Sequence, residues 1–243
     1  MSRDEDRRGE LAANLEAVRG RVDRAREAAG RLDEVRLVVV TKTFPAGDVD
    51  LLASLGVTDV AENRDQEARL KHEACGHQAQ GLTWRMIGQL QRNKVKHVVR
   101  WADTVDSVDR QALVTPLGRE AEAGQRLLGI LLQVNLDPEP DPGRGGVAPA
   151  DLDALADAVA AEAGLRLDGV MGVAPHPGAA DVRDTAGPAF SRLRDLSERL
   201  RRNHPGATVI SAGMSGDLEV AIENGATQVR VGGAILGARP PVQ

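Results

Sequence analysis

The sequence predicts a single-domain (β/α)8 barrel of the TIM type, with an extra helix at its N-terminus. Short β-branched runs alternate with helical patterns along almost all of the 243 residues. Eight such pairs can be counted, which is the number that closes a barrel of parallel strands. A doubly wound open sheet is the second choice, because no Gly-rich dinucleotide fingerprint follows the first strand. No linker divides the chain, so we expect residues 1–243 to form one domain, with the leading helix inside residues 1–30.

The elements follow in order from the spacing of apolar residues. The leading helix is predicted over residues 8–29 and ends near Gly30. Each strand after it is a short β-branched or aliphatic run, and Pro45 closes the first one. The predicted strands are 35–41, 58–61, 83–87, 103–105, 127–135, 165–173, 207–211 and 227–231. Between them, apolar residues three or four positions apart predict helices. The predicted helices are 46–55, 64–73, 89–99, 108–123, 149–163, 185–203 and 214–224, and a short turn follows Gly233. The Pro- and Gly-rich stretch 137–146 is interpreted as the loop after strand five.

Composition excludes several classes of protein. The formal net charge of -5 argues against a nucleic-acid partner, which usually meets a basic face. Cys75 is the only cysteine, and no His, Asp and Glu residues stand at metal-ligand spacing, so we expect neither a disulfide nor a metal. No apolar signal region or membrane span is present. We therefore expect a cytoplasmic protein with no membrane contact, acting as a monomer.

Lys42 ends the first predicted strand, in the run from Leu37 to Pro45. In a barrel of this type, functional groups lie at the C-terminal ends of the strands. A lysine held at the rim of a core is partly desolvated, which would lower its pKa and leave a free amine able to form a Schiff base. The alternative is a surface lysine that merely ends a strand.

The loops after strands seven and eight are predicted to bind a phosphate. The first loop begins at Ser211 and contains Ser215, and the second contains Gly232 and Gly233. These are the usual phosphate-binding positions of this fold. Glycines let the backbone approach an anion, and free amides at a helix start attract it. The alternative is ordinary turn chemistry, with Ser215 as a helix N-cap.

An amine and a phosphate site across one barrel mouth indicate a phosphorylated aldehyde as the ligand. Pyridoxal 5′-phosphate fits this description, with Lys42 as the Schiff-base lysine. A Schiff-base aldolase acting on a sugar phosphate fits the same features.

Several motifs resemble those of the YggS/PROSC-type pyridoxal phosphate homeostasis proteins, over nearly the whole chain. The matching runs are V-V-V-T-K-T at 38–43, A-E-N at 61–63, M-I-G-Q-L-Q-R-N-K at 86–94, Q-V-N at 133–135, G-V-M-G-V at 169–173, S-A-G-M-S-G-D-L-E-V-A-I at 211–222 and V-R-V-G-G-A-I-L-G at 229–237. Their combination in this order is highly specific. The resemblance implies a barrel similar to the cofactor domain of bacterial alanine racemase, and a role in vitamin B6 homeostasis.

The resemblance also implies roles for individual residues. It assigns the Schiff base with pyridoxal 5′-phosphate to Lys42 and places Arg230 near the pyridine nitrogen. It assigns the phosphate to Ser211, Gly232 and Gly233, and the walls of the site to Asn63 and Met214.

The chain departs from this family at two informative positions. Gly233 stands where a Ser or Thr is usual, and the lost hydroxyl removes one charge-assisted hydrogen bond of roughly 1.5–3 kcal/mol. A backbone amide or Ser215 could compensate for it. Arg85 stands where the family usually has a histidine.

Robust catalysis is not expected. Related racemases use a tyrosine and a second domain, and this chain has neither. Arg230 beside the pyridine nitrogen would keep it unprotonated and weaken the cofactor as an electron sink. We therefore expect a protein that holds the cofactor and delivers it to enzymes that lack it, with Lys94 as a second candidate amine. A weak racemase or lyase is the alternative, and a barrel that has lost the cofactor and acts through partners is the third.

Overall fold

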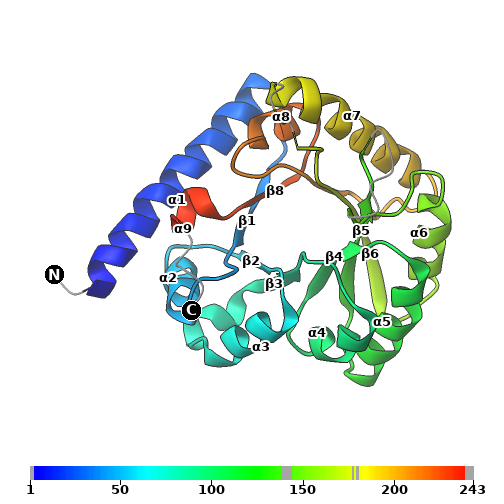
Figure 1. The fold of residues 1–243 in the computed structure, drawn as a ribbon, viewed down its shortest axis with the longest axis horizontal. Helices are drawn as coiled ribbons and strands as arrows, with labels where there is room; N and C mark the ends of the chain where they lie inside the picture. The colour runs from blue at the N-terminus through cyan, green and yellow to red at the C-terminus, as the bar shows by residue number, and fades with distance from the viewer. Residues whose placement is uncertain (1–2, 138–143, 177, 179–180, 239–243) are drawn as a thin grey trace.

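The protein forms a closed barrel of eight parallel strands, seen down the molecule's shortest axis in Figure 1. The computed structural model describes residues 3–137, 144–176, 178 and 181–238. The strands are β1 Arg36–Val40, β2 Asp59–Glu62, β3 Thr83–Met86, β4 Thr104–Val108, β5 Leu128–Val134, β6 Leu165–Gly172, β7 Val209–Ser211 and β8 Gln228–Val231. They pair in sequence order, and β1 pairs with β8 to close the ring. The fold predicted from the sequence is therefore confirmed.

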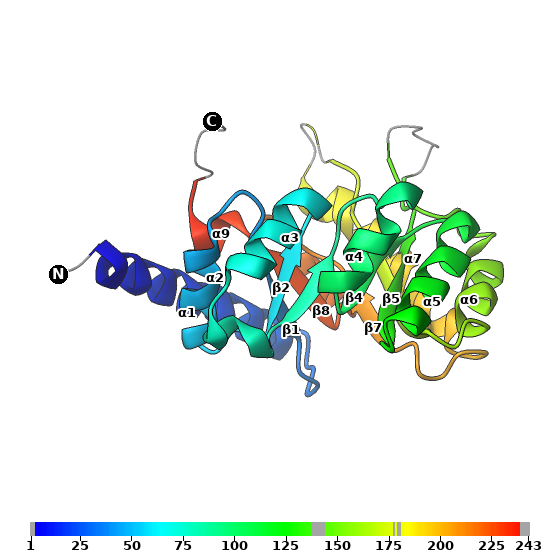
Figure 2. The ribbon, with the colours of Figure 1, turned by 90° about the horizontal axis from the view of Figure 1, so that it is seen from below.

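Helices surround this ring, as the side view in Figure 2 also shows. They are α1 Arg3–Ala28, α2 Ala46–Ser54, α3 Asp65–Ala74, α4 Val95–Trp101, α5 Gln111–Ala123, α6 Leu152–Ala160, α7 Val182–Leu200, α8 Leu218–Glu223 and α9 Gly233–Leu236, with short 3-10 turns η1 His77–Gly81 and η2 Arg92–Lys94. Valine, leucine and isoleucine side chains fill the layer between helices and strands. Within the part of the chain described, no helix is long and apolar enough to cross a bilayer.

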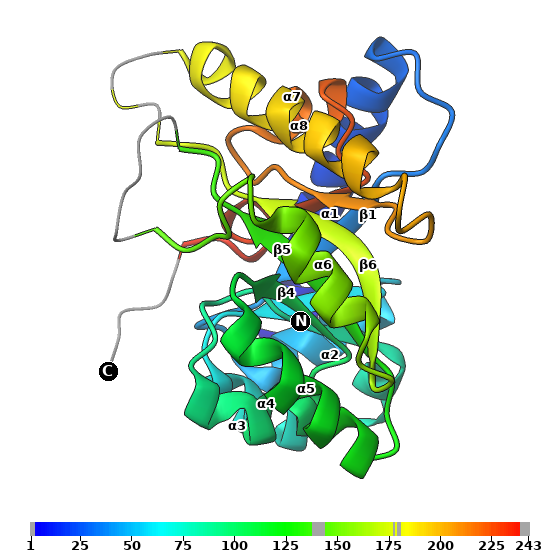
Figure 3. The same ribbon diagram turned by 90° about the vertical axis from the view of Figure 1, so that its right-hand side faces the viewer.

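The leading helix α1 takes a place that a longer last helix would otherwise fill. The apolar residues that predicted it are all buried, namely Leu11, Leu15, Val18, Val22 and Ala25. In the described residues after β8, the four-residue α9 is the last helix, and α1 packs against α8, α9 and α2 (Figure 1). Helix α1 thus covers the part of the barrel wall where β8 meets β1. Figure 3 shows the opposite side of the molecule, where α5 and α6 cover the strands.

Several predicted boundaries were wrong, and three of them bear on the site. Strand β4 continues to Val108, so Asp106 and Ser107 lie within it and do not end it. The helix expected over 89–99 is a 3-10 turn followed by the shorter α4. Helix α8 begins only at Leu218, after an N-cap at Asp217, so Met214 and Ser215 belong to the loop that precedes it. Residues 138–143 of the predicted loop 137–146 lie outside the described residues.

Candidate functional site

A pocket of about 290 Å3 lies at the C-terminal mouth of the barrel. It is lined by residues from the ends of β1, β3, β7 and β8 and the loops that follow them: Val40, Lys42, Phe44, Ile87, Met214, Ser215, Gly216, Arg230, Gly232 and Gly233. An amine, a guanidinium and two glycine-containing loops therefore share one cavity. Such a set of groups can bind a small anionic molecule that also carries an electrophilic carbonyl.

Lys42 reaches this pocket because of its position in the alternation of strand β1. The side chains of Val38 and Val40 pack with Ala61 inside the barrel. Lys42 has the same parity as these valines, so the strand directs it toward the barrel axis at the mouth. The side chain is half-buried there. Thr41 has the opposite parity and faces the helices.

Arg230 on β8 is held from two sides inside the barrel. Its Nη1 donates to Ser211 Oγ at 2.7 Å and its Nη2 donates to the carbonyl of Gly172 at 3.0 Å. Burial lowers the pKa of Arg230, and the charges of Asp106 and Asp217 act in the opposite direction. An arginine stays protonated under such a shift. Arg230 therefore presents a fixed positive charge to the pocket.

Ser211 lies beneath the pocket and does not line it. Its side chain is fully buried, and its Oγ accepts hydrogen bonds from Arg230 and from Gln228 Nε2, the latter at 3.0 Å. A hydroxyl engaged in this way orients the guanidinium above it. Ser215 is the serine of this loop that lines the pocket.

The interior of the barrel below Arg230 carries a network of charges. Arg85 Nε donates to Asp59 Oδ1 at 2.9 Å, and its Nη1 donates to Asp106 Oδ1 at 3.3 Å. Thr104 Oγ1 also donates to Asp106, at 2.9 Å. Burial alone would lower the pKa of Arg85, but Asp106 and Asp59 outweigh it and raise that pKa. The charge of Asp106 thus acts on two arginines, since it also raises the pKa of Arg230 against the effect of burial. The charge of Arg85 is thus balanced by the carboxylates of Asp59 and Asp106.

The second glycine loop leaves room for an anion. Gly232 caps α9, and the first hydrogen bonds of that helix are donated by Ile235 and Leu236 to the Gly232 carbonyl. The amides of Gly233 and Ala234 at the helix start thus have no partner within the helix. A Cβ built on Gly233 would meet no atom within 4 Å. This open space is the part of the pocket best suited to a phosphate.

Asn63 lines an adjacent recess and not the mouth pocket itself. This recess has a volume of about 460 Å3 and also contains Gln89 and Lys94. The loop after β2 is fixed by contact with Gly88, since a Cβ on Gly88 would lie 2.0 Å from the carbonyl oxygen of Asn63. Ser107 Oγ donates to the Gly88 carbonyl at 2.6 Å. The loops after β2 and β3 are thereby joined to each other and to the end of strand β4 at the mouth.

Replacing Gly88 with alanine should destabilise the protein by about 1–3 kcal/mol, because backbone must move to accept the methyl group. Gly81→Ala is the matched control, since a Cβ there meets nothing within 4 Å. Urea denaturation of both variants tests this expectation. Equal unfolding free energies for the two variants would show that the loops adjust freely.

Most predicted site residues therefore meet in one pocket. Lys42, Met214, Arg230, Gly232 and Gly233 line it, whereas Asn63 lies beside it and Ser211 below it. Sequence reasoning missed Val40, Phe44 and Gly216 as lining residues. The parity of Val38, Val40 and Lys42 was the available signal for Val40. Two amide side chains of the Q-V-N motif bind loop backbone: Gln133 Nε2 donates to the Gly145 carbonyl, and Asn135 Oδ1 accepts from the Asp137 amide.

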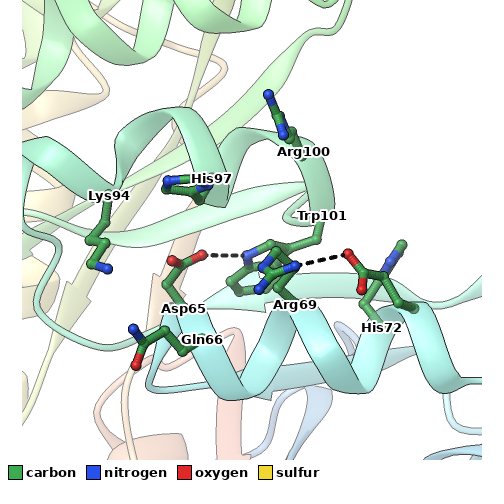
Figure 4. A pocket seen from close by; sticks show the side chains of 9 residues that line it. Asp65, Gln66, Arg69, His72, Lys94, His97, Arg100 and Trp101 are labelled. Atoms are coloured by element: carbon green, nitrogen blue, oxygen red, sulfur yellow. Dashed lines mark hydrogen bonds and ion pairs between the residues drawn. The ribbon is translucent and has the colours of Figure 1, made fainter.

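A larger groove, of about 530 Å3, lies outside the barrel between α3 and α4 (Figure 4). Asp65 accepts a hydrogen bond from Trp101 Nε1 at 3.1 Å in this groove, and Lys94 and His97 lie nearby. The groove contains none of the strand ends of the barrel. Lys94 lines it together with the recess that holds Asn63, so this second candidate amine lies outside the mouth pocket.

Comparison with protein families gives one model that matches most of the chain. It is the N-terminal domain of alanine racemase, matched over residues 13–240. Among curated proteins, the pyridoxal phosphate homeostasis protein of Mycobacterium tuberculosis is 42% identical over 254 residues, which cover 96% of this chain and 95% of that protein.

Solved structures extend the comparison. PipY of Synechococcus elongatus with pyridoxal phosphate bound is 30% identical, with a TM-score of 0.79 and coverage of 93% of this chain and 100% of PipY. Alanine racemase of Clostridium difficile has a TM-score of 0.76 at 12% identity and covers 97% of this chain and 58% of the racemase. The last likeness concerns the fold alone.

Proposed function

Because the chain belongs to the alanine racemase N-terminal domain family, and within it to the pyridoxal phosphate homeostasis proteins, we propose that it binds pyridoxal 5′-phosphate for vitamin B6 homeostasis. In this proposal the cofactor is held as a Schiff base on Lys42. The observation that carries it is the meeting of Lys42, Arg230 and the open space at Gly233 in one mouth pocket. PipY, which is 30% identical, binds this cofactor in its structure.

The residues of the pocket fit each part of this cofactor. Lys42 supplies the amine for the aldehyde, and the amides at the start of α9 with Ser215 suit the phosphate. The apolar side chains of Val40, Phe44 and Ile87 suit an aromatic ring. The volume of about 290 Å3 lies at the lower end of the range for ligand cavities, as expected for a single ring with one phosphate.

We propose that the protein holds the cofactor and does not use it for robust catalysis. When bound, pyridoxal phosphate supplies an electron sink, and this sink is strongest with a protonated ring nitrogen. Arg230 brings a permanent positive charge and no acceptor for such a proton. Burial raises the pKa of Cys75 to about 11, so its thiol remains protonated and unreactive at neutral pH. The protein contains no tyrosine that could act as acid or base.

We further propose that it acts as a monomer and passes the cofactor to enzymes that lack it. The observation that supports delivery is the half-buried position of Lys42 in a pocket open at the mouth, where an incoming amine can reach it. Mixing the loaded protein with an enzyme stripped of its cofactor should restore that enzyme's activity. The rate of this recovery should exceed the rate at which the loaded protein releases the cofactor into buffer. Equal rates would argue against direct delivery.

The direct test of binding is an absorption spectrum of the purified protein with added pyridoxal 5′-phosphate. A Schiff-base band is expected, and borohydride reduction followed by peptide mass mapping should place the adduct on the peptide that contains Lys42. No band, or an adduct spread over surface lysines, would contradict the proposal.

A Gly233→Ser variant should bind the cofactor more tightly than the natural chain. A Cβ built at this position meets no atom within 4 Å, so there is open space for a serine side chain. One hydrogen bond to a charged group contributes about 1.5 kcal/mol or more, which corresponds to at least a roughly tenfold lower dissociation constant. Fluorescence or absorbance titration measures the dissociation constant of the cofactor. Gly206→Ser is the control, at another uncrowded glycine. An unchanged constant would show that the phosphate does not lie at the start of α9.

A further inference from the structure

Two threonines flank Lys42, and both are fastened to the same helix. Thr41 faces the helix layer, because its parity on β1 is opposite to that of Val40. Its carbonyl accepts a hydrogen bond from Lys71 Nζ of α3 at 2.7 Å. Its Oγ1 donates to Glu62 Oε1 at 2.7 Å. The residue before Lys42 is thus held through both its backbone and its side chain.

The residue after Lys42 is held by a different group of the same helix. The amide of Thr43 donates to Glu67 Oε1 of α3. Thr43 has φ of 72°, a left-handed conformation that a β-branched residue rarely adopts. Such a conformation persists only where surrounding contacts enforce it, and it is enriched at functional sites. The hydrogen bond that the Thr43 amide donates to Glu67 is a contact of that kind.

Ion pairs join these groups into one unit, which we call the clamp: Glu62, Glu67 and Lys71. Lys71 Nζ lies 2.5 Å from Glu62 Oε1 and 3.4 Å from Glu67 Oε1. The side chains of Lys71 and Glu62 are 5% and 0% exposed, whereas that of Glu67 is 30% exposed. The clamp lies between strand β2, which carries Glu62, and helix α3, which carries Glu67 and Lys71.

Stability alone is a poor reason for burying these charges. Burial raises the pKa of Glu62, although Lys71 and Thr41 oppose this shift, so desolvation is the dominant effect on that carboxyl group. Glu62 Oε2 is buried and has no hydrogen-bond partner among the described residues. Apolar residues of similar size commonly stabilise such a position as well as an ion pair, or better. The clamp therefore calls for an explanation in terms of position.

We propose that Glu62, Glu67 and Lys71 are positioning residues, which fix the backbone on both sides of Lys42 so that its amine is presented to the ligand in the mouth pocket. This inference rests on the proposed function of Lys42 as the Schiff-base lysine. A lysine on a freely moving strand end would form the same bond more slowly, because only a fraction of its conformations place the amine correctly.

The variant Glu67→Ala tests the clamp, since this carboxylate is partly exposed and its loss leaves the buried Glu62–Lys71 pair intact. The variant is mixed with pyridoxal 5′-phosphate, and Schiff-base formation is monitored by absorbance. Its rate should be about tenfold lower than in the natural protein, the factor that one hydrogen bond to a charged group represents. Glu67→Gln should restore the natural rate, because its amide oxygen can accept the Thr43 amide. Glu73→Ala is the matched control on the same helix, where the exposed carboxylate pairs with Arg69.

A second measurement needs no cofactor. Hydrogen exchange of the Thr43 amide is monitored by nuclear magnetic resonance. Its rate should be at least about tenfold higher in Glu67→Ala than in the natural protein, and it should be unchanged in Glu73→Ala. Natural rates of both exchange and Schiff-base formation in Glu67→Ala would overturn the proposal, as would equally slow formation in Glu67→Gln. If the natural protein forms no Schiff base at all, the proposed function fails, and the exchange data still decide whether the clamp holds Thr43.

Discussion

The Lys42→Ala variant is expected to show no Schiff-base absorption band with pyridoxal 5′-phosphate and no adduct after borohydride reduction. Lys42 is the only lysine among the residues that line the mouth pocket. Without its amine, the cofactor can bind only through the phosphate and ring contacts. The natural protein should gain about 2.7 kcal/mol of stability at a free cofactor concentration one hundred times the dissociation constant. Lys42→Ala should lose most of that gain under the same conditions.

Two controls separate this loss from general damage. Lys94→Ala should keep both the band and the adduct, because Lys94 lies in the outer groove and recess and not in the mouth pocket. In the absence of cofactor, Lys42→Ala should unfold in urea with a free energy within about 1 kcal/mol of the natural value, since a half-buried side chain at a strand end contributes little to the core. An adduct of natural yield in Lys42→Ala would place the Schiff base elsewhere.

The barrel could be predicted from the sequence because its strands and helices differ in the spacing of their apolar residues. Strand β5 and helix α7, for example, are distinguished by length and by the pattern of buried positions. Strand β4 was cut short because Asp106 and Ser107 are polar, and polar residues are usually read as the end of a buried strand. Both side chains are buried and bonded inside the structure, which only the assembled barrel provides.

The site could be predicted only as far as strand ends and loops determine it. Lys42, Gly232 and Gly233 follow from the rule that barrel loops carry function at the C-terminal face. The depth of a side chain does not follow from this rule, so Ser211 was expected at the phosphate although it lies under Arg230. Lys71 gave no signal at all, because a lysine within a polar helix is normally solvated and its partner Thr41 lies 30 residues away in sequence.

The Asp106→Asn variant is expected to lower the free energy of unfolding by about 3–5 kcal/mol, the usual loss when one partner of a buried ion pair is removed. Asp106 is fully buried and accepts from Arg85 at 3.3 Å and from Thr104 at 2.9 Å. Its charge also offsets that of Arg230. Asparagine keeps the shape but leaves these two guanidiniums with less counter-charge inside the barrel. Urea denaturation at neutral pH measures the change.

Asp153→Asn provides the comparison, because Asp153 pairs with Arg199 at 3.4 Å on the surface, where both side chains are more than 40% exposed. Its loss should change stability by at most about 1 kcal/mol. A similarly small change for Asp106→Asn would mean that the barrel interior tolerates unpaired arginines. Since apolar residues could fill this interior at least as stably, the network is better explained by its charge, because Asp106 offsets the charge of Arg230, which lines the mouth pocket. Asp106→Asn should therefore also shift the absorption maximum of the bound cofactor, while Asp153→Asn should leave it unchanged.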